Sequence, residues 1–220
     1  MTTVIISGGN IDKDFSRGFI ETLHESSLFI IACDHGYENC ELIGVTPDLV
    51  VGDFDSASPG TFENIVAAGI DVIKLNPVKD DTDTEAALDV AIAKTTKSDD
   101  IYLLGATGTR LDHVMGNIAL VGKGLKQGRK VHLVDSHNYI DMLQAGETLT
   151  IDEATKFGTY VSVFPYMSSV KGLNMEGFKY PVVDADIYGF NTLTVSNELI
   201  AEKGFISIRE GYLVVMQTRD

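Results

Sequence analysis

The sequence predicts an α/β protein with an N-terminal, Rossmann-like, mostly parallel sheet covered by helices, followed by an all-β C-terminal sandwich domain. Two observations lead to this prediction. Over residues 1–128, short apolar strand patterns alternate with amphipathic helix patterns, as in the β-α units that build parallel sheets. From about Lys130 onward, short β-rich segments punctuated by Gly, Asn and Asp follow one another without a helix pattern, which is typical of a sandwich or barrel. We therefore expect an α/β domain over 1–128 and a β-sandwich over 129–220.

The elements of the first part follow from apolar runs and apolar spacing. Uninterrupted apolar runs indicate strands buried on both faces, and we expect strands at 4–6, 28–32, 49–51, 71–75 and 101–104. Apolar residues at helical spacing predict helices at 15–25, 37–43, 61–68, from about 82, and at 111–126. The fourth helix has the best-marked start, because Thr82 and Glu85 have the spacing of a capping box.

The second part is expected to contain strands only. We predict them at 131–134, 139–143, 148–151, 159–164, 192–195, 205–208 and 212–216. Tyr166 and Phe190 are interpreted as core residues, since aromatic side chains in a β domain usually supply its core. No internal repeat or low-complexity tract interrupts this part.

The charge of the chain limits its partners. Lys and Arg total 17 against 32 Asp and Glu, which gives a formal net charge of -15. Because such a surface repels nucleic-acid backbones and anionic lipids, we expect neither nucleic acid nor membrane as a partner. Cys33 and Cys40 lack a metal-binding spacing and indicate reduced thiols in a cytoplasmic protein. We also expect no signal peptide, because the start of the sequence leads directly into a strand pattern.

Acidic residues gather where predicted strands end or predicted helices begin. They are Asp34, Asp53 with Asp55, Asp80 with Asp81 and Asp83, and Asp112. Each of them alone is explained by capping or turn chemistry. Together they map to the carboxyl edge of the sheet, where open α/β sheets bind ligands, and their mutual repulsion there requires a cation. Since Mg²⁺ is typically held by one or two carboxylates plus substrate phosphates, the pattern predicts a Mg-nucleotide site.

Two glycine-containing loops follow predicted strands. Gly105 and Gly108, with Arg110 at the helix start, are typical of a phosphate-binding loop, because backbone N–H groups and a guanidinium both attract phosphate oxygens. An ordinary strand-to-helix turn explains these glycines nearly as well. The loop at residues 7–10 (SGGN) is a weaker signal, and neither loop is a Walker A motif. Asn117 shares a helical face with His113 and is interpreted as a residue that orients a nucleotide or phosphate, whereas His113 is interpreted as an ordinary helix histidine.

Taken in order, these motifs resemble the thiamine pyrophosphokinase family. The resemblance rests on Asp34-His35-Gly36, residues 47–56 (PDLVVGDFDS), residues 80–88 (DDTDTEAAL), residues 105–113 (GATGTRLDH) with Asn117, Ser196-Asn197-Glu198 and residues 211–214 (GYLV). It spans nearly the whole chain. His35 departs from the pattern, in which glycine is more usual, and the absence of Trp removes the indole platform for thiamine seen in some relatives.

The resemblance implies transfer of pyrophosphate from ATP to the thiamine hydroxyl, giving thiamine diphosphate and AMP. It implies a Mg²⁺-dependent homodimer with its active site near the subunit interface, an ATP-binding catalytic domain over 1–128 and a thiamine-binding and dimerisation domain over 129–220. Asp53, Asp55 and Asp83 would be the metal ligands, with Asp83 or Asp55 as proton acceptor and Arg110 as the charge-neutralising group. The implied substrate-binding residues are Asp34, Gly36, Thr82, Gly105, Thr107, Gly108, Arg110, Asp112, Asn117, Ser196 and Asn197.

Two alternatives remain open from the sequence. One is a pyrophosphokinase for another heterocyclic alcohol, such as a pterin, because the α/β part would look much the same. The other is a Mg-nucleotide-binding sensor without turnover. The β part would discriminate the first alternative, since the shape of the acceptor would be recognised there. The intact set of carboxylates argues against the second.

Overall fold

The computed structural model describes residues 1–23, 27–54, 58–76, 81–108, 110–190 and 192–220. They form two compact units, Met1–Ser136 and His137–Asp220. The first unit consists of parallel strands and helices and the second of antiparallel strands, which confirms the predicted fold class. None of the described helices is long and apolar enough to cross a membrane.

The first unit is built on a parallel sheet with the strand order β4-β3-β2-β1-β5-β6. Its strands are β1 (Thr2–Ile6), β2 (Leu28–Cys33), β3 (Leu49–Gly52), β4 (Asp71–Lys74), β5 (Asp100–Leu104) and β6 (Lys130–Val134). The chain order reverses between β1 and β5, which makes their carboxyl ends the topological switch point of the sheet. β6 was expected in the all-β part, but it pairs in parallel with β5 and belongs to the first unit.

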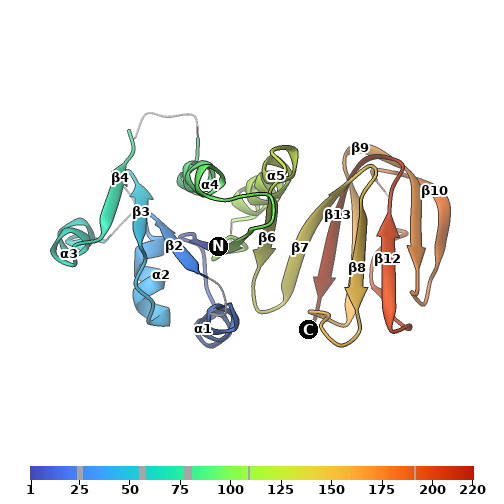
Figure 1. Ribbon diagram of the computed structural model, residues 1–220, viewed down its shortest axis with the longest axis horizontal. Coiled ribbons are helices and arrows are strands. Elements are labelled where there is room, and N and C mark those ends of the chain that lie inside the picture. Colours follow the sequence, from blue (N-terminus) through green and yellow to red (C-terminus); the bar gives the residue numbers. More distant parts are fainter. Residues whose placement is uncertain (24–26, 55–57, 77–80, 109, 191) are drawn as a thin grey trace. The chain divides into compact units, whose positions relative to one another are not determined.

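Helices cover both faces of this sheet. They are α1 (Lys13–Thr22), α2 (Gly36–Ile43), α3 (Thr61–Ala67), α4 (Asp83–Lys94) and α5 (Leu111–Lys126). Figure 1 shows α1 and α2 on one face and α4 and α5 on the other. The central strands are therefore buried on both sides, and Val4, Ile5 and Ile6 of β1 are completely inaccessible to solvent.

The start of α4 is capped as the sequence predicts. The backbone N–H of Glu85 donates a hydrogen bond of 3.2 Å to the hydroxyl oxygen of Thr82. The carboxylate of Glu85, however, lies 2.9 Å from Nζ of Lys123 on α5. The Thr82 half of the capping box is thus confirmed, while the Glu85 side chain joins two helices.

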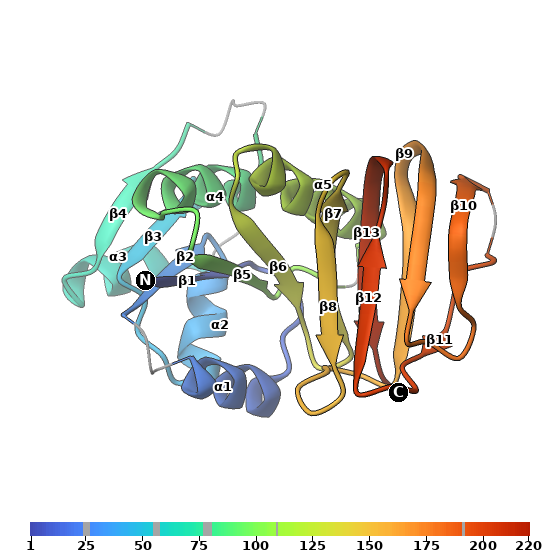
Figure 2. The same cartoon turned by 45° about the vertical axis from the view of Figure 1, so that its right-hand side comes forward.

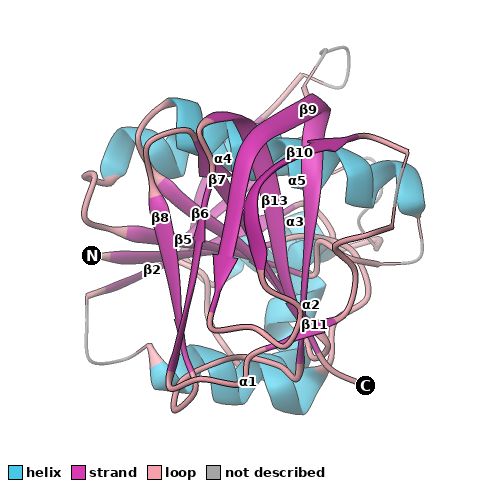
Figure 3. Ribbon diagram, turned by 90° about the vertical axis from the view of Figure 1, so that its right-hand side faces the viewer, coloured by secondary structure: helices cyan, strands magenta, loops and turns pink. Residues whose placement is uncertain are grey.

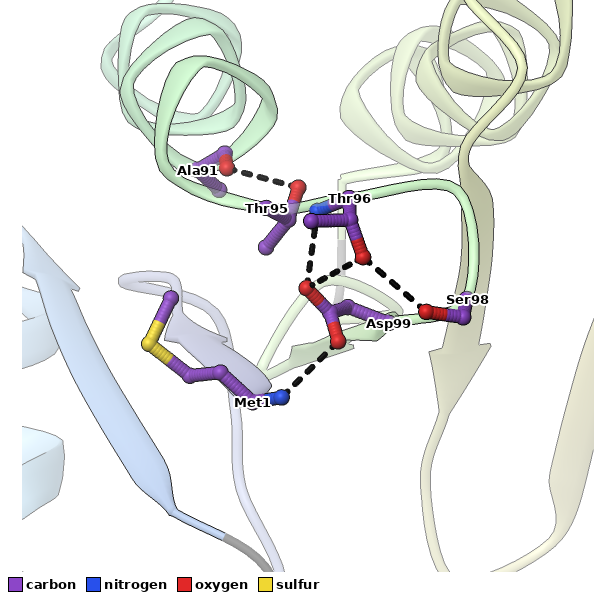
Figure 4. Close-up of polar contacts among 6 residues, drawn as sticks. All are labelled: Met1, Ala91, Thr95, Thr96, Ser98 and Asp99. Atoms are coloured by element: carbon purple, nitrogen blue, oxygen red, sulfur yellow. Dashed lines mark hydrogen bonds and ion pairs between the residues drawn. The ribbon is translucent and has the colours of Figure 1, made fainter.

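The other end of α4 leads into a hydrogen-bond network around Asp99 (Figure 4). One carboxylate oxygen of Asp99 lies 2.8 Å from the amino group of Met1, and the other accepts the backbone N–H of Thr96 at 2.7 Å. These hydrogen bonds lower the pKa of Asp99 to about 2. The hydroxyl group of Thr95 donates to the carbonyl oxygen of Ala91 at 2.9 Å, within the last turn of α4. The network therefore fixes the connection between α4 and β5.

The second unit is an antiparallel sandwich. Its strands are β7 (Asn138–Gln144), β8 (Thr148–Asp152), β9 (Tyr160–Glu176), β10 (Val182–Tyr188), β11 (Asn197–Glu198), β12 (Lys203–Ser207) and β13 (Glu210–Thr218). The long strand β9 belongs to both layers, because its first half pairs mainly with β13 and β11 and its second half with β10 and β12 (Figures 2 and 3). Val163 from the first half and Leu173 from the second are fully buried in one core cluster.

Two predictions for the second unit are wrong. Residues 192–195 form a turn, closed by a hydrogen bond of 3.3 Å from the N–H of Val195 to the carbonyl oxygen of Thr192, instead of a strand. Ser196 then adopts a positive φ of 57°, which ends any extended conformation. Phe190, which the sequence places in the core, is fully exposed on the surface.

Candidate active site

A cleft of about 620 Å³ lies at the carboxyl end of the parallel sheet, at the switch point between β1 and β5. Open α/β sheets bind their ligands at this position. The residues that line the cleft come from the strand ends and the helix starts around it: Ser7, Gly8, Gly9, Asn10, Cys33, Asp34, His35, Asp53, Asp81, Thr82, Asp83, Thr84, Gly105, Ala106, Gly108, Arg110, His113 and Asn117.

Three carboxylates meet in this cleft. Asp34 follows β2, Asp53 follows β3, and Asp83 is the first residue of α4. Their ligand oxygens lie within 4.8 Å of one another, and Asp34 is buried while the other two are half-buried. Hard oxygen donors at this separation fit Mg²⁺. Asp34, expected as a substrate-binding residue, thus joins this group, whereas Asp55 and Asp80 lie outside the described residues.

The position of Asp34 depends on close packing between strand ends. Its backbone has a positive φ of 46°, and its N–H donates to the carbonyl oxygen of Val51 at 3.0 Å. Gly36, two residues later, begins α2 directly beneath β1, where a Cβ atom would lie 2.0 Å from the carbonyl oxygen of Ile6. Gly36 was expected to bind substrate, but it does not line the described cleft. Its local role is to let α2 approach the sheet.

Two glycine loops form one wall of the cleft and are bonded to each other. The N–H of Gly9 donates to the carbonyl oxygen of Gly105 at 2.9 Å. Gly105 has a positive φ of 64°, and a Cβ there would lie 2.5 Å from the carbonyl oxygen of Ser7. Asn39 of α2 is buried beneath them and donates its side-chain amide to the carbonyl oxygens of Ser7 and Gly9 at 2.8 and 2.9 Å. Sequence reasoning missed Asn39, whose one signal was a polar residue on an otherwise apolar helix face.

The start of α5 presents a cation to the cleft. Arg110 lines the cleft and forms an ion pair of 2.6 Å with Asp112, and both side chains are largely exposed. Hydrogen bonding to Arg110 lowers the pKa of Asp112 to about 2. The structure therefore places Asp112 against Arg110 instead of with the three carboxylates. His113, interpreted as an ordinary helix histidine, is exposed and lines the cleft.

The other residues predicted in the first unit either hold the local structure around the cleft or do not line the described cleft. Asn117 is buried and donates its side-chain amide to the carbonyl oxygen of Ala106 at 2.8 Å, which holds the glycine loop against α5. Thr82 caps α4 and also lines the cleft. Thr107 is half-buried and does not line the cleft that the described residues form.

In the second unit, Ser196 and Asn197 differ in their surroundings. Ser196 is exposed, and its N–H donates to the hydroxyl oxygen of Ser162 at 2.9 Å. Asn197 is buried and holds both backbone groups of Tyr180, accepting its N–H at 3.0 Å and donating to its carbonyl oxygen at 2.8 Å. Asn197 therefore has a structural task, whereas the Ser196 side chain is accessible.

The switch-point cleft, with its carboxylates and glycine loops, is suited to hold a phosphorylated ligand and a divalent cation in an α/β protein. Two family models match the chain: the catalytic domain of thiamin pyrophosphokinase over residues 20–133 and its vitamin B1 binding domain over residues 147–213. The chain belongs to the thiamine pyrophosphokinase family, whose members are ATP-dependent pyrophosphotransferases. The resemblance seen in the sequence is thereby confirmed.

Individual relatives agree along the whole chain. The thiamine pyrophosphokinase of Bacillus subtilis (strain 168) is 35% identical over 222 residues, which cover 100% of this chain and 99% of that protein. A crystal structure of the Bacillus subtilis enzyme matches with a TM-score of 0.85 at 32% identity, covering 100% of both chains. A crystal structure of the Geobacillus thermodenitrificans thiamin pyrophosphokinase matches with a TM-score of 0.86 at 32% identity, covering 100% of this chain and 98% of that one.

Proposed function

We propose that this chain transfers the pyrophosphoryl group of Mg-ATP to the hydroxyl group of thiamine, giving thiamine diphosphate and AMP, in the cleft of its first unit. The observation that carries the proposal is the group formed by Asp34, Asp53 and Asp83, whose ligand oxygens lie within 4.8 Å beside the glycine loops. The acceptor is inferred from the family to which the chain belongs.

The metal would be held by these three carboxylates together with the phosphates. Mg²⁺ prefers oxygen ligands and commonly combines one or two carboxylates with substrate oxygens. When bound, it neutralises charge on the transferred group and on the leaving AMP. In its absence the carboxylates repel one another, so the site has a built-in preference for a divalent cation. Asp55 remains a further proposed ligand from the sequence.

The chain's own residues orient the reaction. The thiamine hydroxyl oxygen forms a bond to the β-phosphorus of ATP, and the bond between that phosphorus and the oxygen bridging to the α-phosphate breaks, so AMP leaves with the bridging oxygen. The hydroxyl proton passes to a carboxylate, for which Asp83 and Asp55 are the proposed acceptors. Arg110 pairs with phosphate oxygens, and the backbone around Gly105 and Gly108 binds phosphate at the start of α5. Positioning and charge neutralisation carry most of such a reaction.

The second unit is proposed to bind thiamine and to form a homodimer, with the active site near the subunit interface. Its surface carries several large apolar side chains, and burying them in a subunit interface would remove apolar area from water. Met167, Tyr188, Phe190 and Leu193 of the second unit are exposed, as are Leu111 and Met115 of α5. We further propose a cytoplasmic location, which the free thiols of Cys33 and Cys40 support.

The reaction is tested by incubating the protein with Mg-ATP and thiamine and measuring both products. We expect AMP and thiamine diphosphate in equal amounts, and no turnover when Mg²⁺ is chelated. Asp83→Asn should lose turnover, while Asp89→Asn, on the same helix but bound to Lys123 at 2.7 Å, should retain it. ADP with thiamine monophosphate would contradict pyrophosphoryl transfer. Turnover with a pterin alcohol in place of thiamine, or ATP binding without any turnover, would favour the alternatives.

A further inference from the structure

A small cluster of buried polar side chains lies beneath the carboxylates. The hydroxyl groups of Ser7, at the end of β1, and Thr84, in the first turn of α4, are 3.0 Å apart and buried, although 77 residues separate them in the sequence. Cys33, the last residue of β2, adjoins the same pair. Burial raises the pKa of its thiol, and the nearby Asp83 carboxylate raises it further.

Two members of this cluster are chain neighbours of carboxylates in the cleft. Cys33 directly precedes Asp34, and Thr84 directly follows Asp83. Ser7 is fixed independently, because its N–H donates to the carbonyl oxygen of Leu104 at 2.8 Å and its own carbonyl oxygen accepts the Asn39 amide at 2.8 Å. Ser7 thus contacts Thr84 in the segment that carries Asp83, and it directly follows Ile6, which pairs with Ala32 in the strand that leads to Asp34.

We infer that Ser7 and Thr84 are positioning residues that set the separation of the Asp34 and Asp83 carboxylates and thereby the affinity of the cleft for a divalent cation. This inference rests on the proposed function of those carboxylates. Neither hydroxyl group needs to touch the cation. Removal of a group that hydrogen-bonds directly to a metal ligand typically lowers metal affinity by about 10- to 100-fold. Because Ser7 and Thr84 act through the backbone, we expect an effect at the lower end of this range.

The matched control is a second buried threonine of the same helix. Thr95, at the other end of α4, is buried like Thr84, and its hydroxyl group also makes one hydrogen bond, to the carbonyl oxygen of Ala91 at 2.9 Å. Thr84→Val and Thr95→Val therefore delete the same group from similar surroundings. Only the first deletion removes a contact with the segment that carries Asp83.

The experiment measures Mn²⁺ binding to the full chain without nucleotide, from the electron paramagnetic resonance signal of free Mn²⁺. We expect Thr84→Val and Ser7→Ala each to raise the dissociation constant by about 10-fold, and the double variant to be no weaker than either single one, because both remove the same hydrogen bond. Thr84→Ser, which keeps a hydroxyl group, should retain the wild-type affinity. Thr95→Val should retain it as well. With Mg-ATP and thiamine, Thr84→Val should need more Mg²⁺ for half-maximal turnover.

The outcomes separate this inference from the proposed function. Wild-type Mn²⁺ affinity in folded Thr84→Val, or the same loss in Thr95→Val, would overturn the positioning role. If Thr84→Val does not fold, Ser7→Ala gives the same test, since it deletes the other half of the same contact. Asp83→Asn serves as the reference variant. Wild-type Mn²⁺ affinity in Asp83→Asn would overturn the metal site itself. A loss of Mn²⁺ affinity in Asp83→Asn but not in Thr84→Val or Ser7→Ala would overturn only the positioning role.

Discussion

The guanidinium group of Arg110 holds both carboxylate oxygens of Asp112, with Nη2 at 2.6 Å and Nε at 3.2 Å. Their side chains are 69% and 64% exposed, so this ion pair contributes little to stability. The ion pair instead fixes the orientation of the planar guanidinium group of Arg110, at the start of α5 beside the cleft. An incoming phosphate would compete with Asp112 for these N–H groups or share them.

Arg110→Lys is therefore not expected to be a conservative change. A lysine places a point charge where the guanidinium bridges two oxygens, and we expect kcat/KM for ATP to fall roughly 10-fold or more, about 1.4 kcal/mol per decade. The control is Arg17→Lys, because Arg17 also forms an exposed ion pair, with Glu21 at 3.1 Å, but lies on α1. Equal kinetics for Arg110→Lys and wild type would reduce Arg110 to a partner of Asp112.

Asp53→Asn and Asp55→Asn should each abolish most turnover without disturbing the fold. A metal ligand supplies several kcal/mol of transition-state stabilisation, which corresponds to a loss of roughly 100-fold or more in kcat. Asp53→Asn should also raise the free energy of unfolding without metal, because it removes repulsion within a group whose oxygens lie within 4.8 Å. Urea unfolding with and without Mg²⁺ measures this effect. Near-wild-type turnover of both variants at saturating Mg²⁺ would refute the metal assignment.

The glycine at the start of α2 should tolerate no side chain. A Cβ at Gly36 would lie 2.0 Å from the carbonyl oxygen of Ile6, so we expect Gly36→Ala to lower the free energy of unfolding by about 3 kcal/mol. At Gly18, in the middle of α1, no atom of the described residues lies within 4 Å of a Cβ placed there. Gly18→Ala should therefore stabilise the protein by about 1 kcal/mol, through helix propensity. Denaturant titrations of both variants measure these changes in the free energy of unfolding. An unchanged free energy of unfolding in Gly36→Ala would contradict the close approach of α2 to β1.

Glu38 should make stability depend on pH. Its carboxylate accepts the N–H of Ser58 at 2.8 Å and lies 3.1 Å from Nδ1 of His35. The Ser58 hydrogen bond, followed by the charge of His35, lowers the pKa of Glu38 below its usual 4.5. Because the folded-state pKa is the lower one, this stabilisation is complete above pH 4.5 and is lost as the pH falls through the folded-state pKa.

Comparison of wild type with Glu38→Gln tests this assignment. Glu38→Gln should be less stable at neutral pH, by no more than about 1 kcal/mol for a partly exposed group. The difference between the two proteins should shrink as the pH falls below 4.5. A difference that stays constant from pH 7 to pH 3 would show that the Glu38 charge does not anchor this segment.

The sequence predicts the meeting of Asp34, Asp53 and Asp83 because the carboxyl ends of parallel strands share one edge. It does not predict the strand order: β2 lies between β1 and β3, which places Asp34, after β2, beside Asp53, after β3. Nor does it reveal Asn39, whose two hydrogen bonds arise only when α2 packs beneath the glycine loops. Long-range packing decides both points.

In the second unit, the local pattern of apolar residues gives the wrong secondary structure in two places. Strand β10 has no continuous apolar run, because Asp184 and Asp186 interrupt it, and it was not predicted. Residues 192–195 alternate polar and apolar side chains like a strand, yet the hydroxyl group of Thr194 bonds to the carbonyl oxygen of Val163 and the segment turns. Alternation alone does not distinguish an edge strand from a turn that is held by a neighbouring strand.

The proposed homodimer makes a prediction about mixed subunits. If each active site combines the first unit of one chain with the second unit of its partner, two inactive variants with defects in different units should complement each other. Asp53→Asn disables the first unit. For the second unit, Ser196→Arg is preferred to a change at Asn197, because Ser196 is exposed whereas Asn197 holds the backbone of Tyr180.

Each homodimer should first be shown to lack turnover by itself. After equal amounts exchange subunits at random, about half of the dimers are mixed, and by the symmetry of an isologous dimer each mixed dimer has one intact and one doubly altered site. Activity per subunit should therefore recover to about a quarter of the wild-type value. As a control, Asp53→Asn mixed with Asp83→Asn should not recover, because both changes disable the first unit. If verified exchange between Asp53→Asn and Ser196→Arg restores nothing, the whole site lies within one chain and the shared-site proposal fails.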